Sequence, residues 1–106
     1  MASARLLSTD LLAETLETDG VSTALRTASR SFVSSTATDV GLWEAHPGTD
    51  VDVESDEVFV VLTGAGSVSF EDGSSIALRP GVLVRLHEGD RTTWAVAERL
   101  RKLYIA

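Results

Sequence analysis

The sequence predicts an all-β domain, either a sandwich or a jelly-roll barrel, and the spacing of its apolar runs carries that prediction. In residues 57–94, apolar runs about as long as one β-strand alternate with glycine-marked turns. About seven or eight such runs follow one another at near-regular spacing, a pattern typical of sandwiches and jelly rolls. Helical periodicity is nearly absent after residue 20.

The composition bounds the class of protein. A chain of 106 residues with 43% hydrophobic content fits one domain with a real core. The net charge of −7 argues against nucleic acid or an anionic membrane as partner, because phosphate binding needs clustered Lys and Arg. Cysteine is absent, and no apolar run approaches the roughly 20 residues of a transmembrane helix. No signal-peptide pattern is found, so we predict a cytoplasmic protein.

Residues 1–38 are predicted to form an N-terminal arm in front of a barrel core at residues 39–106. Two alternatives stand for the first half of this arm. One is a short helix capped at residues 8–10, and the other is a loop that packs the leucines of residues 11–16 onto the body. The β-branched and small residues of 21–33 favour an edge strand or an extended arm, which would be free to pack on a partner subunit.

The strands of the core follow from alternation and from turn residues. Residues 50–54 alternate strictly between acids and valines. A turn is predicted at residues 64–66, which are Gly-Ala-Gly, and Asp72-Gly73 predicts a two-residue hairpin. The other expected strands comprise residues 40–45, 58–62, 67–70, 76–78, 82–86, 94–96 and 103–105.

An ordered set of residues covers the last two thirds of the chain. Its members are Trp43-Glu44, Pro47-Gly48, Asp56-Glu57 with the run to Leu62 and Gly64, Asp72-Gly73, Pro80-Gly81, Gly89, Trp94, Glu98, Arg101-Lys102 and Tyr104. Through this set, residues 41–106 resemble small single-domain cupins related to the cupin domain of (S)-ureidoglycine aminohydrolase and to ethanolamine-utilisation cupins. The resemblance implies a double-stranded β-helix, an RmlC-like jelly-roll barrel, with a ligand pocket inside it and a homodimer as the usual assembly.

The first cupin motif that the resemblance implies contains two His, a Glu and a Gly. Glu57 and Gly64 match the second half of this motif. The His positions fall at Asp50 and Asp52, or at the two valines that follow them when the gap is taken differently. Neither pair is histidine.

The second motif departs from the family pattern in the same way. Gly81 and Gly89 match it, but the Pro position is His87 and the His position is Thr92. Of the four metal ligands that the resemblance implies, only Glu57 is present in this sequence. We therefore predict no metal and no other cofactor.

A divalent metal remains as an alternative. Asp50, Asp52 and Glu57 together would offer oxygen ligands to a hard cation. The favoured interpretation is that Asp50 and Asp52 face solvent on an alternating strand.

Two residues are candidates for a catalytic role. Glu57 would act as a base, an acid or a lone ligand inside the barrel, or alternatively would pair with an arginine or lie at the rim. His87 would act as a base, because histidine is the side chain suited to proton transfer at physiological pH, although its place in a turn favours a plain surface residue.

A ligand pocket is predicted inside the barrel, with aromatic walls for a small organic molecule. Its predicted lining is Trp43, Glu57, Phe59, Thr92 and Trp94. The alternative is that the rings simply fill the core. An inward Lys102 would bind an anionic ligand, but a solvated position is favoured for a lysine.

The first functional hypothesis is a small-molecule-binding cupin that lacks the usual catalytic metal. The second is an enzyme, either a metal-dependent hydrolase of small nitrogenous metabolites, as the resemblance implies, or a metal-free isomerase that uses Glu57 or His87. The third is a structural or regulatory homodimer without a ligand. A fold by itself does not choose among these.

Overall fold

The computed structural model describes residues 5–19 and 24–106, and all regular elements in these residues are β-strands. Their bounds are β1 (Glu17–Thr18), β2 (Ala28–Ser34), β3 (Asp39–Ala45), β4 (Gly48–Val53), β5 (Glu57–Phe70), β6 (Ser75–Leu78), β7 (Leu83–Leu86) and β8 (Arg91–Ile105). The prediction of an all-β jelly-roll fold is confirmed. Within the described residues, no helix has the length and apolar character needed to cross a membrane.

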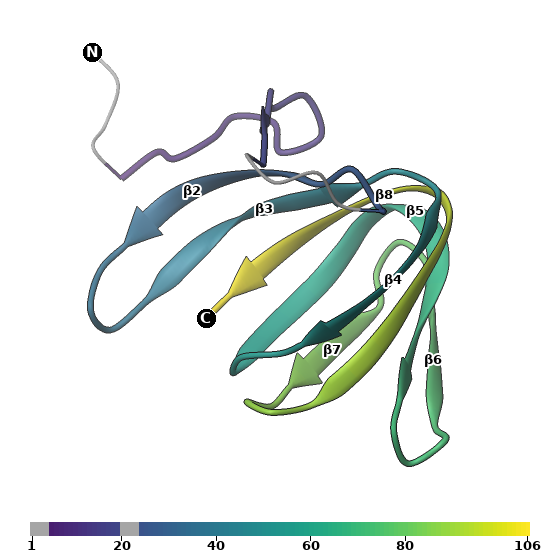
Figure 1. Ribbon diagram of the computed structural model, residues 1–106. Helices are drawn as coiled ribbons and strands as arrows, with labels where there is room; N and C mark the ends of the chain where they lie inside the picture. Colours follow the sequence, from purple (N-terminus) through teal and green to yellow (C-terminus); the bar gives the residue numbers. More distant parts are fainter. Residues whose placement is uncertain (1–4, 20–23) are drawn as a thin grey trace.

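Two long strands, β5 and β8, give the sheet its rolled shape. They pair antiparallel from Val58 opposite Ile105 to Phe70 opposite Thr92. On its other edge β8 pairs first with β4 and then with β3, while β5 pairs first with β7 and then with β6. Both long strands curve through the molecule in Figure 1, and the single antiparallel sheet folds over on itself.

Residues 64–66 do not form the predicted turn, because the chain continues through them as strand β5. The register between β5 and β8 shifts at this point, as it does at β-bulges. Gly64 has a φ of +94°, and a Cβ there would lie 2.3 Å from the Arg99 carbonyl oxygen. A Cβ at Gly66 would lie 2.3 Å from the Ala95 carbonyl oxygen. These glycines let the bent strand β5 approach β8 closely. Because β8 is distant in sequence, the local pattern of residues 64–66 does not reveal this approach.

The hairpin predicted at Asp72-Gly73 exists, but its loop is one residue longer than expected. Phe70 and Ser74 close it through the Phe70 N–H, which donates to the Ser74 carbonyl at 2.9 Å. Gly73 has a φ of +88°, which fits the left-handed position that ends a three-residue loop. The Asp72 carboxylate accepts the Ser74 N–H and hydroxyl, and these bonds hold the longer loop.

The core fills the inside of the roll with alternate residues of the strands, as period-two patterns require. Trp94 and Val96 share the inward face of β8, where both are buried. The buried cluster consists of Leu25, Ala45, Phe59, Val61, Val68, Leu78, Val84, Leu86, Trp94, Val96 and Leu100.

The first half of the arm is a loop and not a helix. The Asp10 carboxylate accepts the Leu12 N–H at 3.0 Å and forms a single turn. The Arg101 guanidinium donates to the carbonyls of Leu11 and Leu12 and also pairs with the buried Glu44 at 2.7 Å. These carbonyls would be the acceptors of a helix in this segment, so Arg101 takes the place of helical hydrogen bonding.

The second half of the arm forms strand β2, which begins later than the predicted segment 21–33. Positions 21–23 lie outside the described residues. β2 pairs with β3 along its length and carries the short β1 on its other edge. The end of the arm is therefore part of the same sheet as the barrel core.

Replacing Gly64 by alanine is expected to destabilise the protein by about 3 kcal/mol, because positive φ and overpacking each cost roughly 1–3 kcal/mol. Urea unfolding of the two variants Gly64→Ala and Gly73→Ala measures the difference. Gly73 has similar φ but nothing within 4 Å of the added Cβ, so it isolates the steric part. Equal losses in the two variants would contradict the close-approach explanation.

Candidate functional site

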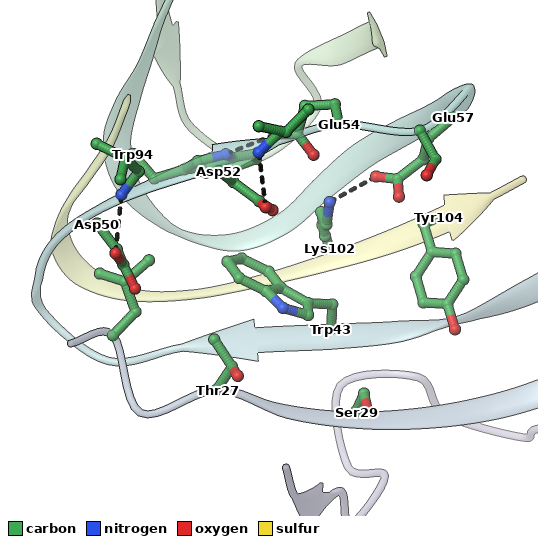
Figure 2. A pocket seen from close by; sticks show the side chains of 14 residues that line it. Thr27, Ser29, Trp43, Asp50, Asp52, Glu54, Glu57, Trp94, Lys102 and Tyr104 are labelled. Carbon is green, nitrogen blue, oxygen red and sulfur yellow. Dashed lines mark hydrogen bonds and ion pairs between the residues drawn. The ribbon is translucent and has the colours of Figure 1, made fainter. Parts of the chain in front are cut away.

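A pocket of about 520 Å³ opens on the inner face of the sheet. Strands β2, β3, β4, β5 and β8 all contribute to it, and Figure 2 shows the side chains that line it. The lining residues are Leu25, Thr27, Ser29, Trp43, Asp50, Val51, Asp52, Val53, Glu54, Ser55, Glu57, Trp94, Lys102 and Tyr104. Segments more than 70 residues apart in sequence therefore meet at one site.

Lys102 lies in this pocket with only 5% of its surface exposed, so the favoured solvated position was wrong. Its Nζ donates to Glu57 Oε2 at 2.5 Å. Strand register explains the orientation, because Lys102 lies opposite Trp43 on β3 and Val61 on β5. Directly opposed residues of antiparallel strands point to the same face, and that face is the inside of the roll.

Three aromatic rings surround the Lys102 ammonium. Nζ lies 4.4 Å from the Phe59 ring centre, 4.9 Å from that of Trp43 and 5.0 Å from that of Trp94. All three distances fall within the range of cation–π attraction. The ring centres of Trp43 and Trp94 are 5.4 Å apart and their ring planes are tilted by 54°, a favourable arrangement for an aromatic pair.

Asp50 and Asp52 form an acidic wall on the pocket side of β4, so the predicted direction of this strand is wrong, although Asp52 is exposed to solvent there. Asp50 lies opposite Trp94 and Asp52 lies opposite Thr92, both of which are buried on the inner face. The intervening Val51 is 72% exposed. The alternation was recognised, but its direction depends on β8, because a one-residue change of register exchanges the two faces.

The carboxyl group of Asp52 has a raised pKa. Burial is the largest cause, and the nearby negative charge of Glu54 adds to it. The Val53 N–H, which donates to Asp52 Oδ1 at 2.8 Å, and the Lys102 ammonium act in the opposite direction. Asp52 is still open to solvent through the pocket mouth, so water screens part of these effects.

Glu54 is a pocket residue that the sequence interpretation missed. Its Oε2 accepts the Thr92 hydroxyl at 2.7 Å and the Trp94 indole N–H at 2.9 Å. These bonds fix both the carboxylate and the Trp94 ring. In the sequence, Glu54 is marked only as an acid at the end of an alternating strand. Its hydrogen-bond partners, Thr92 and Trp94, are about 40 residues away.

The predicted pocket residues divide into two groups. Trp43, Glu57 and Trp94 line the pocket directly. Phe59 is buried in the core beneath the Lys102 ammonium, and Thr92 is buried behind Glu54 and holds it through its hydroxyl. Both therefore support the pocket without lining it.

His87 is not brought to this pocket. It is exposed in the turn after β7, and it lines a separate surface depression with residues such as Glu71 and Arg91. His46, the second histidine of the chain, is also absent from the pocket lining. Of the two catalytic candidates, the structure places only Glu57 in the pocket.

Residues of the arm and the end of β8 complete the pocket, and sequence reasoning did not assign them to it. Leu25, Thr27 and Ser29 come from the arm, and Tyr104 comes from β8. Burial raises the pKa of the Tyr104 hydroxyl, and the charges of Asp39 and Glu57 add to this. The phenol therefore stays protonated at neutral pH and can serve as a hydrogen-bond donor.

The side chains present do not fit the metal site that the cupin motifs imply. Among the residues that the structure describes, no group of three His, Cys, Asp or Glu side chains converges as a ligand set. The one matching ligand, Glu57, is paired with an ammonium group. A divalent cation at Glu57 would meet the positive charge of Lys102 at short range.

A rolled antiparallel sheet with a pocket on its inner face defines a protein of the cupin class. The chain belongs to the family of EutQ-like cupin domains, whose profile matches residues 32–104. This match confirms the resemblance to ethanolamine-utilisation cupins. The specific likeness to ureidoglycine aminohydrolase stays a prediction.

Solved structures agree on the fold. The Clostridium difficile EutQ protein is 17% identical with a TM-score of 0.66, covering 74% of this chain and 65% of that one. Ectoine synthase from P. lautus is 14% identical with a TM-score of 0.70, covering 80% of this chain and 65% of its own. A Rhizobium leguminosarum protein of unknown function is 26% identical, with a TM-score of 0.66 and coverage of 74% and 78%.

This chain spans 65% of the length of the Clostridium difficile EutQ protein and of the P. lautus ectoine synthase. The TM-scores show a shared fold, and at such low identities the likeness says nothing about the chemistry. A search of curated proteins found no significant match.

Replacing Asp52 by asparagine is expected to raise the melting temperature at pH 7 by a small amount. With a raised folded-state pKa, ionisation of Asp52 costs stability as the pH rises above its ordinary value of 3.8. The gain should therefore disappear near pH 3, where the carboxyl is protonated in both states. Melting curves of the variant and the unmodified protein at both pH values measure this.

Asp72→Asn is the matched control with the opposite sign. The Ser74 hydroxyl and N–H lower the pKa of Asp72, so its carboxylate stabilises the fold at neutral pH and this contribution fades in acid. A fall in melting temperature for Asp52→Asn at pH 7 would contradict the assignment of a costly ionised Asp52.

Proposed function

We propose that this protein is a cupin that binds a small polar organic molecule in the pocket, without a metal ion. The observation that carries the proposal is the arrangement of the pocket itself. An opening of about 520 Å³ is lined by aromatic rings, carboxylates, hydroxyls and one ammonium that come from five strands and the arm. Convergent polar groups on an apolar frame are typical of ligand sites.

The charges of the pocket favour a ligand with an amine or another cationic nitrogen. Glu57 balances the charge of Lys102. Asp50, Asp52 and Glu54 are then left without a Lys or Arg among the other lining residues. A bound cationic group would relieve their mutual repulsion, and the Trp43 ring would provide a flat surface for it.

A metal-free acid–base enzyme is the second candidate, and Asp52 is the observation that favours it. Burial raises the pKa of its carboxyl above the ordinary value, which moves it in the direction that general acid–base catalysis requires. Lys102 lies on the same face of the sheet and offers a positive charge to a developing oxyanion. Metal-dependent hydrolysis finds no support in the ligand set of the described residues.

The open polar pocket argues against a purely structural role, since a barrel that served only as a dimerisation surface would need no such opening. The homodimer and the cytoplasmic location stay predictions. The absence of nucleic-acid and membrane partners is also a prediction, and the net charge of −7 supports it.

In a panel of small metabolites, the charge of each compound is expected to decide whether it raises the melting temperature. Primary amines and amino acids should raise the melting temperature at saturating concentration, while alcohols of the same carbon skeleton should not. The shift should weaken as salt is raised from 20 to 500 mM, about the range over which charge screening becomes strong. Differential scanning fluorimetry followed by calorimetry provides both measurements.

The double variant Asp50→Asn/Asp52→Asn should lower the affinity of any amine that binds by about tenfold or more, because it removes two charges of the acidic wall. His87→Ala is the control, since His87 lies outside the pocket, and its affinity should equal that of the unmodified protein. A panel without any shift, or a shift lost in His87→Ala, would count against this pocket as the binding site.

A further inference from the structure

The ammonium of Lys102 is enclosed by groups that recognise cations. Glu57 on β5 holds it with a carboxylate at 2.5 Å, and three rings from β3, β5 and β8 lie within 5.0 Å of it. In Figure 2, Nζ projects toward Glu57 above the Trp43 ring. A carboxylate combined with aromatic rings is the composition of a binding site for alkylammonium groups. Here the occupant belongs to the chain itself.

Lys102 is a buried lysine, and its burial requires an explanation. Burying an ammonium is unfavourable unless a charge or hydrogen bonds replace its water. Lys102 is 95% removed from solvent relative to an exposed lysine, since only 5% of it remains accessible. The three rings and the Glu57 carboxylate supply attractive contacts in place of that water.

Lys102 binds the one residue that matches a metal ligand of the family motifs, Glu57. Asp52 and Thr92 occupy two of the other motif positions, and they lie opposite one another on the inner face of β4 and β8. The charge of Lys102 acts on Asp52 across the pocket.

We propose that Lys102 is the resident cation of this pocket and occupies the place beside Glu57 where the cupin motifs would otherwise hold a metal ion. Among the described residues, its single hydrogen bond is to Glu57, and an ammonium has three N–H donors. If the pocket binds a ligand as proposed above, an oxygen of that ligand meets this ammonium in place of a metal. The cation site itself does not depend on that function.

Chemical rescue tests the site directly. Lys102→Ala removes three methylene groups and the ammonium, and n-propylammonium has the same atoms. We expect the full-length variant to melt below the unmodified protein and to recover at least a third of the loss in millimolar n-propylammonium, saturably. 1-Propanol, a neutral molecule of the same size, should give no such recovery.

In the unmodified protein Lys102 fills this site, so any shift that n-propylammonium gives there arises at the acidic wall of Asp50 and Asp52 and is subtracted. The double variant Lys102→Ala/Glu57→Gln should show no recovery beyond that shift. Equal recovery with 1-propanol, or recovery that survives Glu57→Gln, would overturn the proposal. A failed metabolite panel would leave these outcomes unchanged, so the two proposals fail separately.

Lys102→Met provides a second test if the alanine variant does not fold. The methionine side chain fills the space of the lysine side chain without a charge. A double-variant cycle with Glu57→Gln should show strong coupling, with the combined fall in melting temperature well short of the sum of the two single falls. Additive effects would overturn the pairing.

Metal titration completes the test. Chelator-treated unmodified protein should give no calorimetric signal with Mn²⁺ or Zn²⁺ at up to millimolar concentration. Binding that Glu57→Gln weakens tenfold or more would show that a metal and not Lys102 is the resident cation.

Discussion

The pairing of β5 with β8 is the constraint on which the rest of the structure depends. Each strand is long enough to join two shorter strands on its far edge, and both bend, so one sheet encloses a core. The bend places the backbones in contact at Gly64 and Gly66, where a side chain would collide with carbonyl oxygens of β8. The register of this pairing, continued through β8 to β3 and β4, then decides which side chains enter the pocket.

The interior that results is not uniformly apolar. On the inner face the rings of Trp43, Phe59 and Trp94 enclose the Lys102–Glu57 pair, while Glu54 receives hydrogen bonds from β8. Buried charges of this kind seldom increase stability over well-packed apolar residues, and they are costly to leave half-paired. Their presence at the base of an open pocket is therefore easier to explain by binding chemistry than by folding.

The candidate site was predictable to the extent that it depends on strand patterns. Trp43 was found as a large ring on a recognisable strand, and Glu57 through its match to the first cupin motif. Trp94 was placed inward because it lies two residues after Thr92, which occupies a motif position. Lys102 was assigned to solvent because lysines are rarely buried, a preference that holds on average and fails where a carboxylate and aromatic rings are supplied from other strands. The sequence holds no local sign of those partners, since Glu57 is 45 residues away.

The sequence by itself determined the fold class and the family of this protein. Period-two alternation and glycine-marked turns are local properties, and they predict the fold class without knowledge of contacts. The family follows from the resemblance carried by the ordered set of residues from Trp43 to Tyr104. The tertiary structure decided the direction of the acidic wall, the continuation of β5 through its glycines and the burial of Lys102. Each of these depends on the register between strands that are distant in the chain, and a shift of one residue in that register would turn Asp50 and Asp52 outward and bring Val51 and Val53 inward.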